Sequence, residues 1–307
     1  EGKCQTSLRG SKLTWWLNGR VSNTHEVAIL KVLITGGAGF LGLRLARALC
    51  ELDRLSTSSG EPQRIEQIVL FDHVSADLQG QDERMRSVVG DVASADDLKQ
   101  VIGEGVDSIF HLAAVVSGQA EQDFDLGMRS NLDSTRLLLE SLRKAGNVPR
   151  MVFASSVAVF GPDPSNPMPN IVADNTLPSP QTSYGTHKLM LEYLLADFTR
   201  KGYVDGRAAR LMTVTVRPGK PNGAASSFFS GIIREPLAGE EAILPVSPEV
   251  RHPVSSPTRT VQGLIAVYEA SREAFRGRTA LNLPALNVTV QQMLDALEQV
   301  AGPAVRA

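Results

Sequence analysis

The stretch "ILKVLITGGAGFLGLRLARALCELD", residues 29–53, joins a short apolar run to a group of glycines and then to a helical pattern. Gly36, Gly39 and Gly42 stand three residues apart at the junction. Glycines at such a turn permit a sharp bend, let backbone N–H groups approach a pyrophosphate, and allow close packing of helix on strand. A flexible glycine-rich turn is the alternative, but a position between strand and helix is the context that dinucleotide binding requires. We therefore expect a dinucleotide site made by Gly36, Gly39, Phe40, Leu41 and Gly42.

Compact apolar runs recur along the chain and alternate with helical patterns. The runs are "QIVLFD" (67–72), "RSVVGD" (86–91), "DSIFHLAAVV" (107–116), "RMVFASSVAVF" (150–160) and "ARLMTVTVRPG" (209–219). Helical spacing appears between them at 94–103, 124–146 and 183–195. Continuous apolar strands alternating with helices indicate a parallel sheet covered on both faces. The predicted fold class is therefore α/β, a doubly wound parallel sheet of the Rossmann type.

The chain divides by composition into three parts. Residues 1–29 show little periodicity and are expected to be a disordered extension. Residues 30–216 carry the strand–helix alternation and are predicted to bind the dinucleotide. Residues 217–307 are first rich in Gly, Pro and Ser and then helical, and they predict a small substrate-binding lobe on the other side of the cleft. The polar stretch 54–67 is interpreted as a loop inserted before the second strand.

The bulk composition excludes several classes of protein. Of 307 residues, 42% are hydrophobic and 21% charged, the formal net charge is −2, and the pI is about 6.3. These values give no electrostatic basis for binding nucleic acid or an anionic membrane, and no run approaches the ~18 apolar residues of a membrane span. Two cysteines, Cys4 and Cys50, are too few for a disulfide framework or a metal cluster. A reducing cytoplasmic compartment fits this usage.

Acidic residues follow the second and third predicted strands. A carboxylate at Asp72 can accept hydrogen bonds from the adenine ribose hydroxyls and would repel a 2′-phosphate, which favours NAD over NADP. Its separation from the glycines exceeds the usual ~20 residues, and the insertion at 54–67 accounts for that. Asp91, with the adjacent Val92, is expected to meet the adenine. The alternative is that Asp91 caps the helix that follows.

Tyr184 and Lys188 stand four residues apart in "SYGTHKLMLEYLL" (183–195). Residues at i and i+4 lie on one face of a helix, so the phenol and the ammonium should point the same way. Surface decoration is the alternative. An alcohol loses its proton as hydride moves to a nicotinamide, and a nearby ammonium favours the phenolate that takes this proton. We therefore expect Lys188 and the positive nicotinamide to lower the pKa of Tyr184 from its ordinary value of about 10.

Several motifs, taken in order, resemble the extended short-chain dehydrogenase/reductase family, which includes NAD-dependent epimerases and dehydratases. They are "TGGAGFLG" (35–42), "FHLAA" (110–114), "ASSVAVFG" (154–161), "YGTHK" (184–188) and "VRPG" (216–219), and the resemblance covers roughly residues 30–300. Within the family, the stretches 111–133, 180–188, 216–242 and 281–302 resemble the D-erythronate dehydrogenase group. That group oxidises the C2 hydroxyl of a four-carbon sugar acid with NAD. The resemblance implies the same activity and cofactor here.

The family motif also implies roles for single residues. Tyr184 matches the proton acceptor, Lys188 its lysine, and Ser156 the serine that orients the substrate hydroxyl. Lys188 is expected to hold the nicotinamide ribose as well. The other positions expected to contact the cofactor are Leu112, Ala113, Ala114, Asn131, Ser155 and Tyr184. Two alternatives stay open: His111 as a satisfied strand-end histidine, and Ser155–Ser156 as ordinary strand-end polar residues. His187 falls on another helix face and is expected to be exposed.

The substrate side of the cleft is predicted less sharply. The carboxylate of a sugar acid needs a cationic or N–H-rich partner, ideally a bidentate one. Arg234 and Arg259 are the candidates, although a solvated helix-flank charge is the commoner role. Small polar residues suited to a polyol are Ser117, Ser156, Asn222, Ser226 and Ser227, with Gln119 and Asp123 as further contacts.

The resemblance carries two further expectations and leaves rival functions open. Family members usually continue for tens of residues past the point matching "ALEQVAGPAVRA" (296–307), so the chain is expected to be C-terminally truncated. A homodimer through the helices at 123–145 and 183–200 is also implied.

The rival functions are a sugar-nucleotide epimerase of the same fold and a non-catalytic NAD-binding regulator. A dehydratase is disfavoured because Val157 and Ala158 stand where its acidic pair would be.

Overall fold

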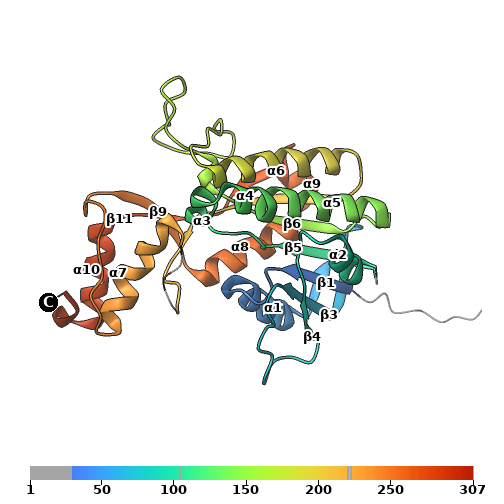
Figure 1. Ribbon diagram of the computed structural model, residues 1–307, viewed down its shortest axis with the longest axis horizontal. Helices are drawn as coiled ribbons and strands as arrows, with labels where there is room; N and C mark the ends of the chain where they lie inside the picture. The colour runs from blue at the N-terminus through green and yellow to red at the C-terminus, as the bar shows by residue number, and fades with distance from the viewer. Residues whose placement is uncertain (1–29, 104, 220, 222, 307) are drawn as a thin grey trace, which may run out of the picture.

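A computed structural model describes residues 30–103, 105–219, 221 and 223–306, so the extension at 1–29 lies outside the described residues. The centre of the structure is an eight-stranded sheet whose main path runs β10-β7-β6-β5-β1-β3-β2, with β4 also paired to β3 (Figure 1). The strands are β1 (Leu30–Thr35), β2 (Arg54–Ser56), β3 (Pro62–Asp72), β4 (Met85–Val89), β5 (Ser108–His111), β6 (Arg150–Ser156), β7 (Asp205–Leu211) and β10 (Ala280–Asn282). Every pairing except β2 with β3 is parallel.

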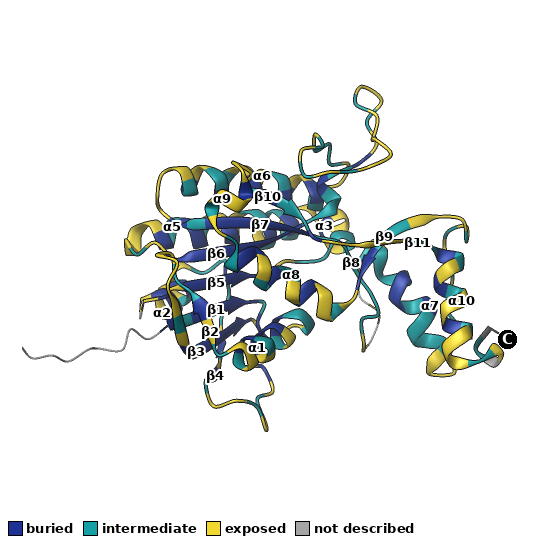
Figure 2. Cartoon of the chain, turned by 180° about the vertical axis from the view of Figure 1, so that it is seen from behind, coloured by how far each residue is buried: buried dark blue, intermediate teal, exposed yellow. Residues whose placement is uncertain are grey.

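Helices cover both faces of this sheet, and each face has its own hydrophobic core. On one face, α1 (Phe40–Leu52) and α8 (Pro257–Glu269) pack through buried residues such as Leu45 and Leu264. On the other face, α2 (Ala95–Ile102), α5 (Ser134–Ala145) and α6 (Ser183–Arg200) pack through residues such as Leu139 and Leu191. Figure 2 shows the strands between these layers as largely buried. The doubly wound α/β fold predicted from the alternation of apolar runs and helices is confirmed.

Short helical elements complete the structure, most of them around the large sheet and two of them packed against α7 or α10. They are α3 (Ser117–Gln122), α4 (Phe124–Gly127), a π-helix (Met128–Asp133), α9 (Arg272–Phe275), and 3₁₀ turns at Val157–Val159, Ala225–Ser227 and Pro303–Arg306. The predicted loop at 54–67 is wrong in part. Arg54–Ser56 pairs antiparallel with Pro62–Arg64 as a hairpin, because Leu55 and Ile65 are apolar side chains that the core buries.

A second, three-stranded sheet adjoins the carboxyl ends of the large one. Its order is β11-β9-β8, from β8 (Thr213–Val214), β9 (Arg251–Ser255) and β11 (Leu286–Thr289). It packs with α7 (Phe228–Leu237) and α10 (Val290–Ala301) around a small core that includes Phe229, Val254 and Met293. Between these elements, α8 and β10 return to the large sheet. The division into domains at residue 217 stays a prediction, and Pro257–Asn282 packs with the larger unit.

Candidate active site

A cleft of about 650 Å³ lies between the large sheet and the lobe formed by β8, β9 and α7. Its floor is made by the segments that follow β1, β5 and β6, where these parallel strands end. The strand order changes direction at β1. The chain runs from β1 to β3 and β4 on one side of it and then crosses to β5 on the other side. Such a switch point is where open α/β sheets bind their ligands.

The glycine loop forms one end of the cleft. Gly36, Gly39, Phe40, Leu41 and Gly42, all predicted from the sequence, line it. Gly36 has φ +70°, in the region that favours glycine. A Cβ added to Gly42 would lie 2.3 Å from the Gly36 carbonyl oxygen, so loop and helix approach too closely for any side chain there. This backbone crowding beside the α1 N-terminus fits the pyrophosphate of a dinucleotide.

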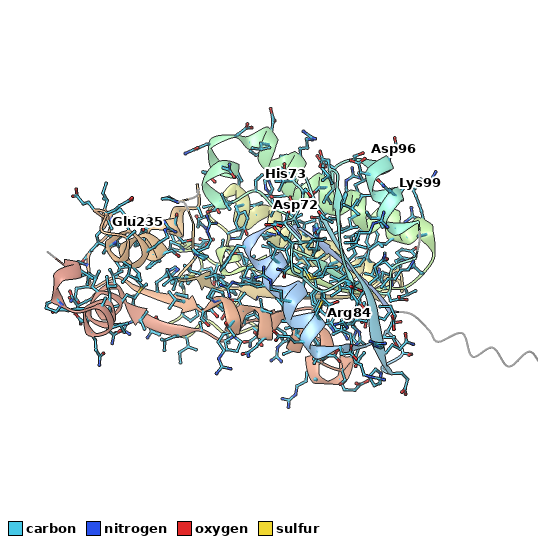
Figure 3. All side chains as sticks on the ribbon, turned by 90° about the horizontal axis from the view of Figure 1, so that it is seen from below. Asp72, His73, Arg84, Asp96, Lys99 and Glu235 are labelled. Carbon is cyan, nitrogen blue, oxygen red and sulfur yellow. The ribbon has the colours of Figure 1, made fainter. Side chains whose placement is uncertain are left out.

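Asp72 ends β3 beside the glycine loop, where Figure 3 places it next to His73. One carboxylate oxygen accepts a hydrogen bond from the Ala38 N–H at 3.1 Å, and the other accepts one from the His73 N–H at 2.8 Å. The His73 ring nitrogen Nδ1 also lies 2.8 Å from that second oxygen. Asp72 is 8% exposed and is not among the residues lining the cleft. In the structure Asp72 stabilises the glycine loop through its hydrogen bond with Ala38. Its contact with an adenine ribose stays a prediction.

Several other predicted cofactor residues are not among the residues that line the cleft. Asp91 forms an ion pair with Arg129 and accepts a hydrogen bond from the Ala93 N–H at 2.8 Å. The alternative that Asp91 caps α2 is wrong, because Ser94 is the N-cap and accepts from the Asp97 N–H. Val92 is buried. Their contact with the adenine stays a prediction.

Asn131 and Ala113 support the segment after β5, whose Leu112 and Ala114 line the cleft. Asn131 is 1% exposed, and its side-chain amide exchanges two hydrogen bonds with the Val115 backbone, at 2.8 and 3.3 Å. It lies in the π-helix, a distortion that is frequent at functional sites. Ala113 packs against Gly36. These two residues therefore position the cleft wall from behind.

His111 has a hydrogen-bond partner at each ring nitrogen, as expected for a structural histidine at the end of a strand. Its ring nitrogens lie 2.5 Å from the Thr35 hydroxyl and 2.8 Å from the Thr135 hydroxyl. Complete burial lowers its pKa to about 3, so the ring is neutral at any working pH.

His187, expected to be exposed, is 2% exposed. That expectation was wrong because α3 and α4 pack against this face of α6, with Phe124 beside the ring.

Tyr184 and Lys188 both line the cleft from the first turns of α6. The Thr182 hydroxyl caps this helix by accepting from the Gly185 N–H at 3.1 Å, and Glu121 accepts from the Ser183 N–H at 3.0 Å. The Lys188 ammonium nitrogen donates to the Ala154 carbonyl at 2.8 Å. It lies 5.5 Å from the centre of the Tyr184 ring. The predicted i, i+4 arrangement on one helix face is therefore present.

Ser156 ends β6 opposite this turn and also lines the cleft. Its hydroxyl accepts from the Ala158 N–H at 3.1 Å, and its interaction with Tyr184 favours the phenolate. Ser155 lines the cleft too, but its hydroxyl donates to the Glu192 carboxylate at 2.5 Å. Ser156, Tyr184 and Lys188 thus meet at one point of the cleft.

Burial determines the electrostatics of this point. Burial raises the pKa of Tyr184 to about 12, and the hydrogen bond with Ser156 lowers it by less. Burial also lowers the pKa of Lys188 to about 7. The expectation that Lys188 and the positive nicotinamide together lower the tyrosine pKa stays a prediction, and burial acts against it. Desolvation disfavours the charged form of each.

The opposite wall of the cleft carries two guanidinium groups, Arg217 and Arg234. Arg234 donates to the Arg217 carbonyl at 2.9 Å and forms an ion pair with Glu235. Burial and the nearby charge of Arg234 lower the pKa of Arg217. Ser117, Ser226 and Ser227 line the cleft as predicted. Asn222 lies outside the described residues.

Other substrate-side candidates are placed elsewhere. Asp123 caps α4 by accepting from the Leu126 N–H at 2.9 Å, and neither it nor Gln119 is among the cleft-lining residues. Sequence reasoning missed Thr182, Thr213, Ser230 and His252, which do line the cleft. Thr213 and His252 are joined by a 2.6 Å hydrogen bond between β8 and β9. No pattern in the sequence signals that pairing, since the two residues are 39 positions apart.

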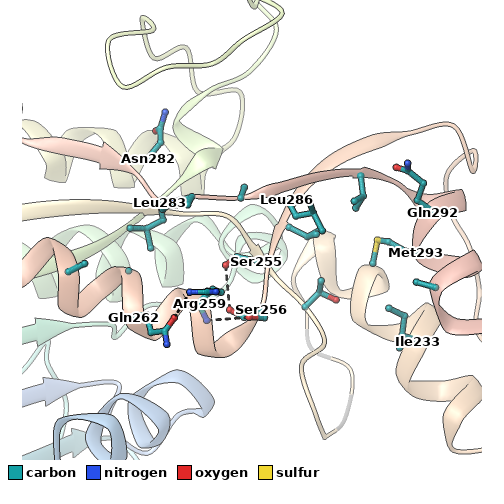
Figure 4. Close-up of a pocket in the computed structure, with 18 of the residues that line it drawn as sticks. Ile233, Ser255, Ser256, Arg259, Gln262, Asn282, Leu283, Leu286, Gln292 and Met293 are labelled. Carbon is teal, nitrogen blue, oxygen red and sulfur yellow. Dashed lines mark hydrogen bonds between the residues drawn. The ribbon is translucent and has the colours of Figure 1, made fainter. Parts of the chain in front are cut away.

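A larger cavity of about 1090 Å³ lies beyond α8, on the other side of the small sheet (Figure 4). Its lining is mostly aliphatic, with side chains such as Leu283, Leu286 and Met293. Arg259, one of the two carboxylate candidates, lines this cavity and donates to Gln262 at 3.1 Å. Its assignment to the substrate cleft was therefore wrong. Because this cavity has no group suited to proton transfer, the smaller cleft is the candidate active site.

Two negative findings concern the described residues alone. No cluster of histidine, cysteine, aspartate and glutamate in that part of the chain could hold a metal ion. None of the helices described has the length and apolar character needed to cross a membrane.

Residues 32–253 match the family model described as the NAD dependent epimerase/dehydratase family. The chain belongs to this family. It is 51% identical over 277 residues to the D-erythronate dehydrogenase of Cupriavidus necator, which covers 90% of this chain and 83% of the relative. It is 44% identical over 276 residues to the D-erythronate dehydrogenase of Haemophilus influenzae, covering 90% and 84%.

A solved structure of another family member has the same fold. The nucleoside-diphosphate-sugar epimerase from Agrobacterium tumefaciens is 40% identical, superposes with a TM-score of 0.81, and covers 90% of this chain and 80% of its own. Membership of the family and the curated dehydrogenase relatives identify the chain as an NAD-dependent oxidoreductase acting on a small molecule. The glycine loop and the carboxylate at the end of β3 are suited to this cofactor.

Proposed function

We propose that the chain oxidises the C2 hydroxyl of D-erythronate to 2-dehydro-D-erythronate. The observation that carries the proposal is that Ser156, Tyr184 and Lys188 share one cleft with Arg234, in a chain half identical to a D-erythronate dehydrogenase. The first three side chains suit the oxidation of an alcohol, and a guanidinium suits the carboxylate of a sugar acid.

Each of these side chains has a distinct task in the proposed reaction. NAD supplies the hydride acceptor and, in its oxidised form, a positive ring charge. Tyr184 accepts the hydroxyl proton as phenolate while the C2–H bond breaks and the C=O bond forms. Ser156, which lines the cleft together with Tyr184, holds the reacting oxygen in line with the phenol. Lys188 binds the nicotinamide ribose and contributes the positive charge that a buried phenolate needs.

Arg234 is proposed to bind the substrate carboxylate. Arg234→Gln should raise KM for D-erythronate by about 10- to 100-fold with a smaller change in kcat, since a hydrogen bond to a charged group contributes about 1.5–3 kcal/mol. Initial rates at varied substrate concentration measure the change. Arg259→Gln is the matched control, because that guanidinium lines the other cavity. An unchanged KM in Arg234→Gln would remove this residue from the substrate site.

A sugar-nucleotide epimerase is a second candidate, favoured by the 40% identity to the Agrobacterium tumefaciens epimerase. The two reactions differ in the fate of the hydride. An epimerase returns it to the sugar, so no free NADH accumulates, whereas a dehydrogenase releases one NADH per turnover. Incubation with NAD and either D-erythronate or a UDP-sugar separates the two by the NADH formed and the sugar recovered. The non-catalytic regulator is disfavoured because Ser156, Tyr184 and Lys188 converge in the cleft.

We also propose a homodimer built on α5 and α6. Large apolar side chains are exposed on this side of the molecule: Phe124 of α4 is 61% exposed, and Met190 and Tyr193 of α6 are 49% and 65% exposed. Such side chains are depleted from ordinary surfaces and gather at interfaces. Sedimentation velocity should give twice the mass of one chain, and a single species at the mass of one chain would contradict the proposal. The cytoplasmic location stays a prediction.

A further inference from the structure

A buried ion pair lies directly behind the candidate active site. Arg210 of β7 donates to both oxygens of the Glu192 carboxylate, at 2.9 and 2.7 Å. Ser155 donates to the same carboxylate at 2.5 Å. Glu192, Arg210 and Ser155 are each no more than 4% exposed. A carboxylate buried in this way is fixed in one orientation by its two donors.

This ion pair adjoins Lys188 on two elements. Glu192 follows Lys188 by four residues on α6, so both side chains lie on the same helix face. On β6, Lys188 donates to the Ala154 carbonyl, and Ser155, the next residue, donates to Glu192. Lys188 therefore stands between the Tyr184 ring in front and the Glu192 carboxylate behind.

We propose that Glu192 is a positioning residue that keeps Lys188 protonated inside the dry cleft. The inference deepens the proposed function and rests on the role given there to Lys188 in holding NAD. Glu192 itself touches neither substrate nor cofactor in this account. It acts through the lysine.

The charges around Lys188 support this assignment. Burial disfavours the ammonium form, and Glu192 opposes that effect by raising the pKa of Lys188. The other titratable groups facing the lysine are Tyr184 and His187 from α6 and His111 from β5. Burial lowers the pKa of both histidines, and His111 is neutral. The charge of Arg210 is directed at Glu192, which weakens but does not cancel the attraction between Glu192 and Lys188. No direct ion pair joins Lys188 to Glu192 among the described residues, so the ammonium hydrogens that are not donated to Ala154 stay available to ligands.

The test is the affinity for NAD as a function of pH from 6 to 10, measured by calorimetry or by quenching of protein fluorescence. In the wild-type protein, Kd should rise with pH as Lys188 loses its proton. In Glu192→Gln, this inflection should move to lower pH by about one unit, since a nearby opposite charge shifts a pKa by 1–3 units. Glu192→Asp, which keeps the charge, should restore most of the wild-type position.

Asp205→Asn is the matched control. Asp205 is a carboxylate paired with Arg150 and Arg207 at the opposite end of β7, so its removal should leave the inflection in place. Glu192→Gln leaves Arg210 without a counter-charge, which destabilises a folded protein. If it does not fold, Glu192→Met with Arg210→Met removes both charges, and a smaller shift in the same direction is expected.

An inflection at the wild-type pH in a folded Glu192→Gln or double-Met variant would overturn the inference. A wild-type Kd that does not change with pH would overturn it as well, together with the role given to Lys188. Binding needs no turnover, so failure to oxidise D-erythronate would refute the proposed substrate and leave this result standing.

Discussion

Tyr184→Phe should lower kcat for D-erythronate by about 10²- to 10⁴-fold, the range that a positioned proton acceptor contributes. Phenylalanine fills the same volume in the cleft but cannot accept the hydroxyl proton. The Kd for NAD should change little, because Lys188 and the glycine loop are left intact. Steady-state rates and an NAD titration measure the two effects.

Tyr193→Phe is the matched control for that substitution. Tyr193 lies on the same helix and is 65% exposed, so losing its hydroxyl should leave kcat unchanged. A Tyr184→Phe enzyme that retains more than a tenth of the wild-type kcat would mean that another group accepts the proton.

Gly42→Ala should reduce the affinity for NAD by at least about 100-fold, or prevent folding. The added methyl would lie 2.3 Å from the Gly36 carbonyl oxygen and 2.7 Å from that of Gly37. Both are backbone atoms of the loop, so the loop has to move away from the helix that it joins. A misplaced loop loses the close approach of its N–H groups to a pyrophosphate.

Gly231→Ala in α7 is the corresponding control, because its methyl would meet only the Glu235 side chain, whose nearest atom lies at 3.4 Å. NAD titration together with circular dichroism measures affinity and folding in both variants. A folded Gly42→Ala protein with wild-type affinity for NAD would contradict the assignment of the loop.

Local patterns were enough to predict the large sheet and the centre of the site. The apolar runs are buried on both faces, and only parallel strands between two helix layers produce that pattern. The roles of Gly36 and Gly42 were predictable because the close approach of backbone atoms there leaves no room for a side chain. The proximity of Tyr184 and Lys188 was predictable because helical spacing alone puts both side chains on one face.

Features that depend on packing between distant segments were not predictable. His187 is buried by α3 and α4, which precede it by about sixty residues. Arg259 and Arg234 look alike in sequence, but α8 directs one into the second cavity and α7 places the other in the cleft. The contacts of Asp72 and Asn131 with backbone groups of neighbouring loops likewise appear only in the folded chain.

The pKa of Tyr184 depends on burial as well as on proximity. The sequence predicts that Lys188 and the positive nicotinamide lower it, whereas burial of Tyr184 raises it to about 12. The account therefore expects the rate of oxidation to rise as pH increases, as more of the tyrosine becomes phenolate. Loss of the Lys188 proton, which we propose Glu192 to oppose, limits that rise at the alkaline end.

The most direct test of the central claim is the formation of NADH by the purified protein given NAD and D-erythronate. The account predicts turnover that yields one 2-dehydro-D-erythronate per NADH and that Tyr184→Phe abolishes almost completely. A protein that binds NAD but forms no NADH from D-erythronate would contradict it.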